Sequence, residues 1–214
     1  MNMVETLGKA GIIPVIVIEK EEQAVPLARA LVKGGLPVLE VTFRTKAAPG
    51  AIAAIRREVP EAILGAGTLL TPEMVKAAKA AGAVFGVAPG FDPVVLAAAK
   101  AEGLPMCPGI ATASELSQAL TAGCTMVKFF PAEAAGGVKM IKNLLLGAFR
   151  FTGVKFMPTG GVNLSNVADY LAVPEIICCG GTWIVPKDAL AKGDWAAIEK
   201  LASDATALVK SMRG

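Results

Sequence analysis

The chain has 214 residues, a net charge of +3, and a composition in which more than half the residues are hydrophobic and few are aromatic. This predicts one domain spanning residues 1–214 with a large core, and the scattered basic residues argue against a nucleic-acid or membrane partner. The sequence contains no histidine, which excludes Ser-His and Cys-His nucleophile pairs and the usual His-ligated zinc site. Proton transfers must therefore use Glu, Asp, Lys, Cys, Tyr170 or water.

Short apolar segments alternate along the chain with amphipathic, alanine-rich segments, after a predicted N-terminal helix over residues 1–10. The apolar segments are predicted to be strands, at residues 12–18, 38–43, 62–66, 84–88, 105–107, 126–130, 154–157 and 176–179. The amphipathic segments are predicted to be helices, at residues 22–33, 47–58, 72–81, 93–102, 112–122, 137–148, 164–171 and 195–212. Capping residues before first-turn prolines and glycines after the last turns support these boundaries.

The regular alternation of strand and helix defines the fold class as α/β. Eight β/α units in about 200 residues predict a closed (β/α)₈ barrel of the TIM type, with the N-terminal helix over its bottom. The alternative is an open, doubly wound sheet. Such a sheet normally carries a GxGxxG turn after its first strand, and this sequence has none there.

The sequence also indicates where the protein works. No uncharged stretch approaches the roughly 18 residues that a bilayer span needs, and the apolar run at residues 11–18 leads straight into acidic residues rather than a cleavage site. We therefore expect a cytoplasmic protein. Its cysteines are expected to be reduced, small hydrophobic residues rather than disulfides or metal ligands; they are Cys107, Cys124, Cys178 and Cys179.

Two charged residues occupy inward-facing positions of predicted strands. The residues on either side of Glu40 are apolar and should pack on the helices, and the same alternation points Lys128 inward from the sixth strand. Apolar surroundings disfavour the ammonium form of lysine, and a neutral amine attacks ketones to form a protonated imine. A nearby carboxylate can then move protons. The alternatives are a lysine at the strand end that extends to solvent and, for Glu40, a buried ion pair with a purely structural role.

Small and polar residues follow several predicted strands, where the active site of a barrel lies. Pro158-Thr159-Gly160-Gly161 follows the seventh strand and Gly180-Gly181-Thr182 the eighth, and these two loops often bind phosphate through backbone N–H groups. Thr68 places a hydroxyl at the same rim, and Arg44 could hold a carboxylate with two hydrogen bonds.

Five motifs then resemble one family, in order and spacing, from about residue 12 to residue 195. The motifs are Leu39-Glu40-Val41-Thr42-Phe43-Arg44-Thr45, Gly65-Ala66-Gly67-Thr68, Ala88-Pro89-Gly90, Lys128-Phe129-Phe130-Pro131-Ala132-Glu133 and Pro158-Thr159-Gly160-Gly161. They resemble the bacterial 2-keto-3-deoxy-6-phosphogluconate (KDPG) aldolases, which also act as 4-hydroxy-2-oxoglutarate (KHG) aldolases.

The resemblance implies a role for each matching residue. Lys128 would form the Schiff base and Glu40 would be the general acid and base. The other implied positions bind substrate: Arg44 and Thr68 the pyruvate carboxylate, Pro89 and Phe130 the pocket wall, and Thr159, Gly160, Gly161, Gly180, Gly181 and Thr182 the phosphate. The resemblance further implies a cytoplasmic homotrimer of the Entner–Doudoroff pathway, with no cofactor and no metal.

The predicted reaction is the reversible cleavage of KDPG to pyruvate and D-glyceraldehyde 3-phosphate. Cleavage of 4-hydroxy-2-oxoglutarate to pyruvate and glyoxylate is a second expected activity. Two other interpretations remain open from the residues alone. One is a phosphosugar epimerase or isomerase, which needs the glycine-rich loops and no buried lysine. The other is a non-catalytic barrel that binds a phosphorylated ligand.

Overall fold

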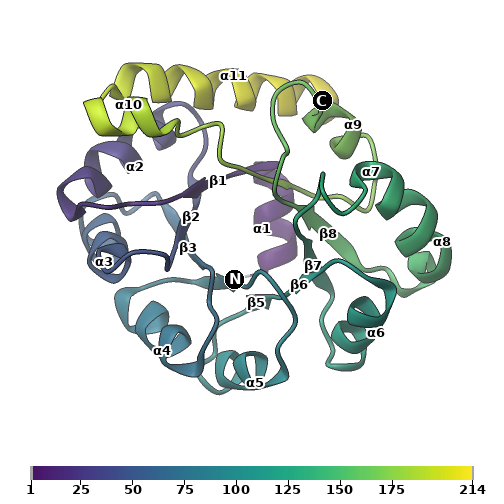
Figure 1. Cartoon of the computed structure of the whole chain (residues 1–214). Coiled ribbons are helices and arrows are strands. Elements are labelled where there is room, and N and C mark those ends of the chain that lie inside the picture. Colours follow the sequence, from purple (N-terminus) through teal and green to yellow (C-terminus); the bar gives the residue numbers. More distant parts are fainter. Residues whose placement is uncertain (1, 214) are drawn as a thin grey trace.

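The computed structural model describes residues 2–213, apart from the side chain of Leu144. Its strands are short and parallel, and they lie inside a surrounding layer of helices (Figure 1). The strands are β1 (Ile12–Ile16), β2 (Val38–Thr42), β3 (Ile63–Gly67), β4 (Phe85–Val87), β5 (Met106–Cys107), β6 (Gly109–Ile110), β7 (Met126–Phe129), β8 (Lys155–Pro158) and β9 (Cys179–Gly181). The α/β class predicted from the alternation is confirmed.

The strands form a six-stranded sheet in the order β5-β4-β3-β2-β1-β9 and a three-stranded sheet in the order β6-β7-β8. A single residue, Pro108, separates β5 from β6, where one strand was predicted. Proline lacks the N–H group that would continue the ladder, although its carbonyl still accepts a hydrogen bond from the Lys128 N–H at 2.8 Å. Between β8 and β9, Thr159 and Gly180 form an isolated parallel bridge.

The helices follow the prediction closely except in the last third of the chain. Their bounds are α1 (Met3–Ala10), α2 (Ala24–Lys33), α3 (Ala48–Glu58), α4 (Pro72–Ala81), α5 (Pro93–Ala101), α6 (Ala113–Thr121), α7 (Gly137–Met140), α8 (Leu146–Phe149), α9 (Val167–Leu171), α10 (Lys187–Lys192) and α11 (Trp195–Arg213). A π-helical turn, Ile141–Leu145, interrupts the helix predicted over 137–148, and α10 was not predicted. Within residues 2–213, no helix combines the length and apolar character needed to cross a bilayer.

Several helices begin at capping residues that can be recognised in the sequence. Thr71 and Asp92 accept hydrogen bonds from backbone N–H groups of α4 and α5, and each is followed by a proline. Thr112 and Glu115 form a reciprocal capping box at the start of α6. These side chains satisfy amide groups that would otherwise be unpaired, which explains why the predicted starts of these helices were accurate.

Two apolar clusters show which way the strand residues point. The larger cluster lies between strands and helices and contains Leu39, Val41, Val127 and Phe129. The smaller cluster fills the space enclosed by the strands, and its members are Leu7, Ile13, Val38, Phe85, Val87, Cys107, Met126, Met157 and Cys178. The predicted alternation in the second and sixth strands is therefore confirmed. The presence of fully buried Leu7 in the inner cluster confirms that α1 covers one end of it.

The eighth strand lies later in the chain than predicted. Gly180 and Gly181 belong to β9, where they pair with Ile13 and Pro14, rather than to a loop after it. A Cβ atom at Gly180 would lie 2.3 Å from Thr159 Oγ1, and one at Gly181 would lie 2.1 Å from the ring of Trp183. The two glycines are thus needed for close packing within the strand. Residue 176, where the strand was predicted to begin, makes only an isolated bridge to Phe156.

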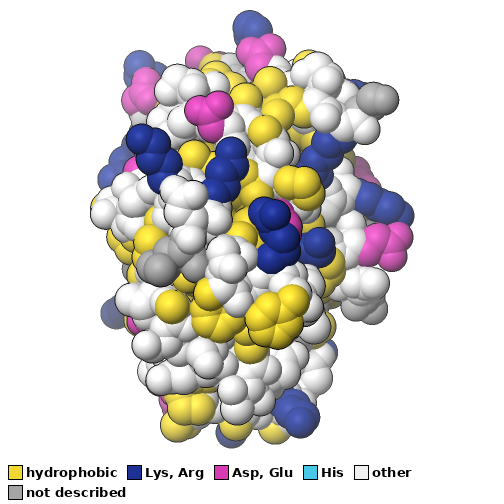
Figure 2. Space-filling model, turned by 90° about the vertical axis from the view of Figure 1, so that its right-hand side faces the viewer, with side chains coloured by type: hydrophobic (Ala, Val, Ile, Leu, Met, Phe, Trp, Pro, Cys, Tyr) yellow, Lys and Arg dark blue, Asp and Glu magenta, His cyan; other side chains and the backbone are white. Residues whose placement is uncertain are grey.

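On the flank shown in Figure 2, Lys and Arg side chains are spread among apolar and uncharged groups, with a few acidic side chains between them. This distribution is what the scattered basic residues of the sequence predict. The cysteines are free thiols, and Cys107, Cys178 and Cys179 are buried. Burial raises the pKa of all three thiols, so they remain protonated at neutral pH.

Candidate active site

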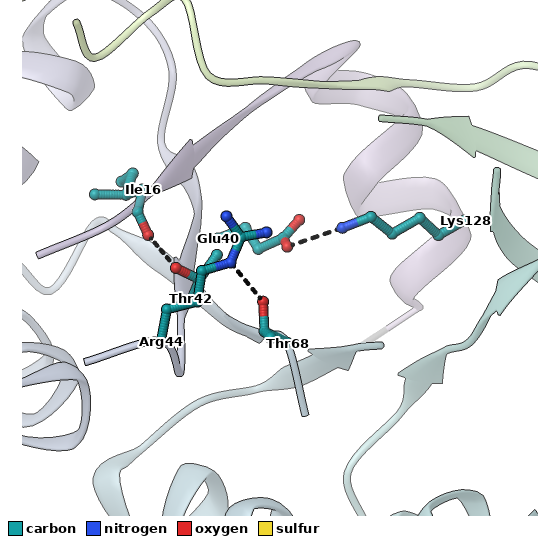
Figure 3. A network of polar contacts seen from close by, with 6 residues as sticks. All are labelled: Ile16, Glu40, Thr42, Arg44, Thr68 and Lys128. Atoms are coloured by element: carbon teal, nitrogen blue, oxygen red, sulfur yellow. Dashed lines mark hydrogen bonds and ion pairs between the residues drawn. The ribbon is translucent and has the colours of Figure 1, made fainter. Parts of the chain in front are cut away.

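Lys128 and Glu40 meet inside the space enclosed by the strands. Lys128 Nζ lies 3.3 Å from Glu40 Oε1, and the two residues are 4% and 0% exposed. They extend toward each other from β7 and β2, which belong to different sheets (Figure 3). The neighbours of each residue along its strand face the helices, so the pair is surrounded by protein. A buried amine beside a buried carboxylate is an arrangement found at functional sites.

The carboxylate of Glu40 occupies space that a glycine leaves open. A Cβ atom at Gly67, the last residue of β3, would lie 2.2 Å from Glu40 Oε1 and 2.8 Å from Glu40 Cγ. Glu40 Oε2 is buried and has no hydrogen-bond partner within residues 2–213. An unpaired buried oxygen is costly, and here it leaves one carboxylate oxygen available for a proton.

Polar side chains after β2 and β3 form a rim beside this pair. Arg44 Nε donates a hydrogen bond to Thr68 Oγ1 at 3.3 Å, which brings together the two predicted carboxylate-binding residues (Figure 3). Thr68 has a φ angle of +59°, a left-handed conformation that non-glycine residues rarely adopt. The bond is made through Nε, and within residues 2–213 the two terminal guanidinium nitrogens of exposed Arg44 remain free for an anion. Deeper in the site, Thr42 Oγ1 donates to the carbonyl of Ile16 at 2.9 Å.

Of the two apolar residues predicted for the pocket wall, Phe130 lies close to the lysine and Pro89 lies beside the adjacent strand β6. The ring centroid of Phe130 is 5.3 Å from Lys128 Nζ, within the range of a cation–π contact. Pro89 lies against Gly109, where an added Cβ would be 2.2 Å from the Pro89 carbonyl. Gly109 is the register partner of Lys128, so Pro89 lies beside the strand next to the one that carries the lysine.

The loop after β8 turns its peptide carbonyls toward the segment that follows Lys128. The carbonyl of Thr159 accepts a hydrogen bond from the Ala132 N–H at 2.8 Å, and that of Gly160 accepts one from the Glu133 N–H at 3.0 Å. In a trans peptide the C=O and N–H groups point in opposite directions. The N–H groups of Gly160 and Gly161 therefore point away from this segment.

The next peptide unit follows the same rule. The carbonyl of Gly161 accepts hydrogen bonds from Asn163 Nδ2 at 3.0 Å and Asn166 Nδ2 at 3.1 Å, which directs the Val162 N–H the opposite way. None of the N–H groups of Gly160, Gly161 and Val162 donates to another residue within 2–213. Gly160 and Gly161 both have positive φ angles, +97° and +82°. Successive free amides in such a loop can hold an anion.

The eighth-strand residues take a different position from the predicted one. Gly180 and Gly181 are buried inside β9, so the prediction that they form a loop after the strand is wrong. Thr182 follows the strand and is exposed. Thr159 Oγ1 lies close to Gly180 and has no partner within residues 2–213. The structure thus brings Thr159, Gly180 and the Gly160-Gly161 loop to one edge.

Two residues at this site, Gly67 and Glu133, were given no role by the sequence analysis. Gly67 was quoted in a motif but given no role, and a glycine beside a strand end carries no signal of its own. Cys107, by contrast, belongs to the inner cluster with the residues that flank the pair, in agreement with the prediction that it is a small buried hydrophobic residue. Glu133 contacts Tyr170, a contact between side chains 37 residues apart. Within residues 2–213, no three acidic or cysteine side chains gather as metal ligands would.

Comparisons with known proteins agree with this geometry. A family model described as KDPG and KHG aldolase matches residues 3–201. The chain is 50% identical over 199 residues to a KHG/KDPG aldolase of Escherichia coli, covering 93% of this chain and 92% of that one. It is 47% identical over 212 residues to a 2-dehydro-3-deoxy-phosphogluconate aldolase of Treponema pallidum, covering 99% and 100%.

A solved structure gives the same result in three dimensions. The crystal structure of the KDPG aldolase of Legionella pneumophila, with pyruvate captured as a covalent carbinolamine intermediate, is 42% identical to this chain. It matches with a TM-score of 0.90 over 95% of this chain and 98% of that one.

Proposed function

Because the chain belongs to the KDPG and KHG aldolase family, we propose that it cleaves KDPG to pyruvate and D-glyceraldehyde 3-phosphate as a class I aldolase. The observation that carries the proposal is the Lys128–Glu40 pair, 3.3 Å apart and almost fully buried. An isomerase or a binding protein with the same phosphate loop has no need of such a pair.

The reaction begins with Lys128 as a nucleophile. Glu40 accepts a proton from the Lys128 ammonium, which the 3.3 Å contact allows, and the neutral amine attacks the C2 ketone of KDPG. The resulting carbinolamine loses water to give a protonated imine. This imine is the electron sink of the reaction, so the step draws on no metal or cofactor.

Cleavage uses the same carboxylate as a base. Glu40 takes the proton of the C4 hydroxyl, directly or through a water, as the electrons of the C3–C4 bond move into the imine. Glyceraldehyde 3-phosphate leaves and an enamine remains on Lys128. Glu40 then returns a proton to the enamine carbon, and hydrolysis of the new imine releases pyruvate and regenerates the amine.

The surrounding residues bind the ends of the substrate. Arg44 and Thr68 hold the carboxylate, with the Arg44–Thr68 hydrogen bond fixing the guanidinium. Phe130 and Pro89 cover the apolar part of the chain. The free amides of Gly160 and Gly161 receive the phosphate, with Thr159, Gly180, Gly181 and Thr182 forming the adjoining edge. A substrate without phosphate, 4-hydroxy-2-oxoglutarate, is cleaved at the same pair to pyruvate and glyoxylate.

We extend the proposal to the architecture and setting of the enzyme. The two sheets form a closed (β/α)₈ barrel, because one residue separates β5 from β6 and the Thr159–Gly180 bridge joins β8 to β9. Residues 1–214 form one domain, which assembles as a homotrimer and works in the cytoplasm in the Entner–Doudoroff pathway. Sedimentation at three times the chain mass would support the trimer, and a monomer would refute it.

Trapping with borohydride tests the chemistry. Reduction in the presence of pyruvate should abolish activity and leave a pyruvate-derived adduct on Lys128, located by peptide mass spectrometry. Lys128→Ala should abolish turnover, and Lys128→Arg is the matched variant because it retains a charge for Glu40 without a nucleophilic amine. An active enzyme after borohydride treatment, with no adduct, would favour an epimerase or isomerase.

The role of Glu40 and the choice of substrate need two further measurements. Glu40→Gln should slow cleavage strongly and still permit some imine formation, whereas an unchanged rate would remove Glu40 from the mechanism. A coupled lactate dehydrogenase assay measures pyruvate release from KDPG and from 4-hydroxy-2-oxoglutarate. Phosphosugar binding without pyruvate release from either compound would contradict the aldolase function.

A further inference from the structure

Glu133 links the segment after Lys128 to the loop that presents the free amides. Its backbone N–H donates to the Gly160 carbonyl at 3.0 Å. Its side chain also packs on the next residue, since a Cβ at Gly161 would lie 2.6 Å from both Cβ and Cγ of Glu133. The position of Glu133 therefore fixes the peptide unit that carries the Gly161 N–H.

Tyr170 in turn fixes Glu133. The Tyr170 hydroxyl donates a hydrogen bond to Glu133 Oε1, and the tyrosine is only 1% exposed, which makes it one of the largest fully buried side chains of the protein. Burial, and the hydrogen bond to the Glu133 carboxylate, raise the pKa of Tyr170. The hydroxyl thus stays protonated at neutral pH and remains a donor.

The carboxylate of Glu133 is held beside Tyr170 and the first turn of α7. Gly137, in the first turn of α7, lies next to both partners, since a Cβ there would be 3.2 Å from Glu133 Oε1 and 3.4 Å from the Tyr170 hydroxyl. The hydrogen bond from Tyr170 holds the Glu133 side chain in place, and the Glu133 backbone N–H in turn limits the motion of the Gly160 peptide. A loop that is already ordered binds its ligand at a lower entropic cost.

We propose that Glu133 and Tyr170 are a positioning pair that sets the affinity of the enzyme for the phosphate of its substrate. The inference rests on the proposed aldolase function and extends it to substrate preference. Lys128 is held independently, because β7 pairs with β8 along its length and with β6 at Lys128 and Phe129. Loss of the Glu133–Tyr170 hydrogen bond therefore weakens binding of phosphorylated 2-oxo acids and leaves the imine chemistry at Lys128 intact.

The test compares two substrates that differ in the phosphate. In Tyr170→Phe, which removes one oxygen atom, the KM for KDPG should rise about tenfold, the order expected for losing a hydrogen bond to a charged group. The kcat for KDPG and both constants for 4-hydroxy-2-oxoglutarate should stay within about twofold. The inhibition constant of inorganic phosphate should rise by the same factor as the KM for KDPG.

Matched variants separate positioning from folding. Glu133→Gln keeps an oxygen acceptor for Tyr170 and should behave almost like the wild type, whereas Glu133→Ala, at an exposed residue, should reproduce the effect of Tyr170→Phe. Thr206→Val is the control, because it removes a hydroxyl that lies 2.9 Å from the carbonyl oxygens of both Gly34 and Ala202, far along the chain from the loop. It should leave both KM values unchanged.

The outcomes distinguish this inference from the function on which it rests. An equal change for the two substrates, or no change in Tyr170→Phe and Glu133→Ala, would overturn the positioning role while the wild type still releases pyruvate. Absence of pyruvate release from both substrates in the wild type would instead overturn the aldolase function.

Discussion

Gly67→Ala tests whether the geometry of the Lys128–Glu40 pair sets the rate of the enzyme. The added Cβ would lie 2.2 Å from Glu40 Oε1 and 2.8 Å from Glu40 Cγ, whereas nonbonded heavy atoms rest at about 3.5–4.0 Å. The carboxylate must therefore retreat by at least about 1 Å. The Lys128 Nζ–Glu40 Oε1 distance is already 3.3 Å, so a displacement of that size in Oε1 disturbs the geometry of the hydrogen bond.

The expected loss of rate is large for the addition of one methyl group. A displacement of about 1 Å at a catalytic group lowers rates by about 10²-fold, so we expect kcat for pyruvate release from KDPG to fall by about that factor. The backbone of Gly67 is not in the left-handed region, and alanine is compatible with it. The fold should therefore persist, which circular dichroism and thermal unfolding would check.

Gly147→Ala is the matched control for this substitution. Gly147 is exposed in α8, and a Cβ there would meet no atom within 4 Å. The same chemical change should leave kcat unaltered and raise stability by roughly 0.5–1 kcal/mol, as alanine does in a helix. If Gly67→Ala is folded and retains kcat within about threefold, the contact between Gly67 and Glu40 does not govern the reaction.

Two further substitutions and one thiol-labelling experiment test other parts of the structure. Arg44→Lys should raise the KM for pyruvate in the condensation direction about tenfold, because lysine cannot bridge Thr68 and a carboxylate in the same way. An unchanged KM would exclude a contact between Arg44 and the pyruvate carboxylate. Leu7→Ala should cost about 2–5 kcal/mol in urea unfolding, since Leu7 is fully buried against the inner cluster, and a cost below about 1 kcal/mol would contradict that packing. For the thiols, Cys124 should be alkylated before buried Cys107 in the native protein, and labelling of Cys107 first would be inconsistent with its burial. Because partial burial raises the pKa of Cys124 above its ordinary value of 9.0, its alkylation rate should still be rising as pH passes 9.

The direction of the Glu40 and Lys128 side chains was determined by the sequence. Side chains along a strand alternate with a period of two, and this rule holds whatever the strand pairs with. It was enough to place Glu40 and Lys128 on the inner faces of β2 and β7, which the two apolar clusters confirm. Helix starts at Thr71, Asp92 and Thr112 were equally local, because a capping side chain bonds backbone groups within three residues.

The contacts that join distant segments were decided by the tertiary structure. Nothing near Glu40 in the sequence indicates that Gly67 leaves room for its carboxylate, and the Glu133–Tyr170 bond spans two separate elements. The end of the eighth strand was misjudged for the same reason: Gly180 and Gly181 resemble a loop until Ile13 and Pro14 pair with them. Local sequence sets which face a residue occupies, but the distance between two faces depends on the packing of strands that meet only when the chain has folded.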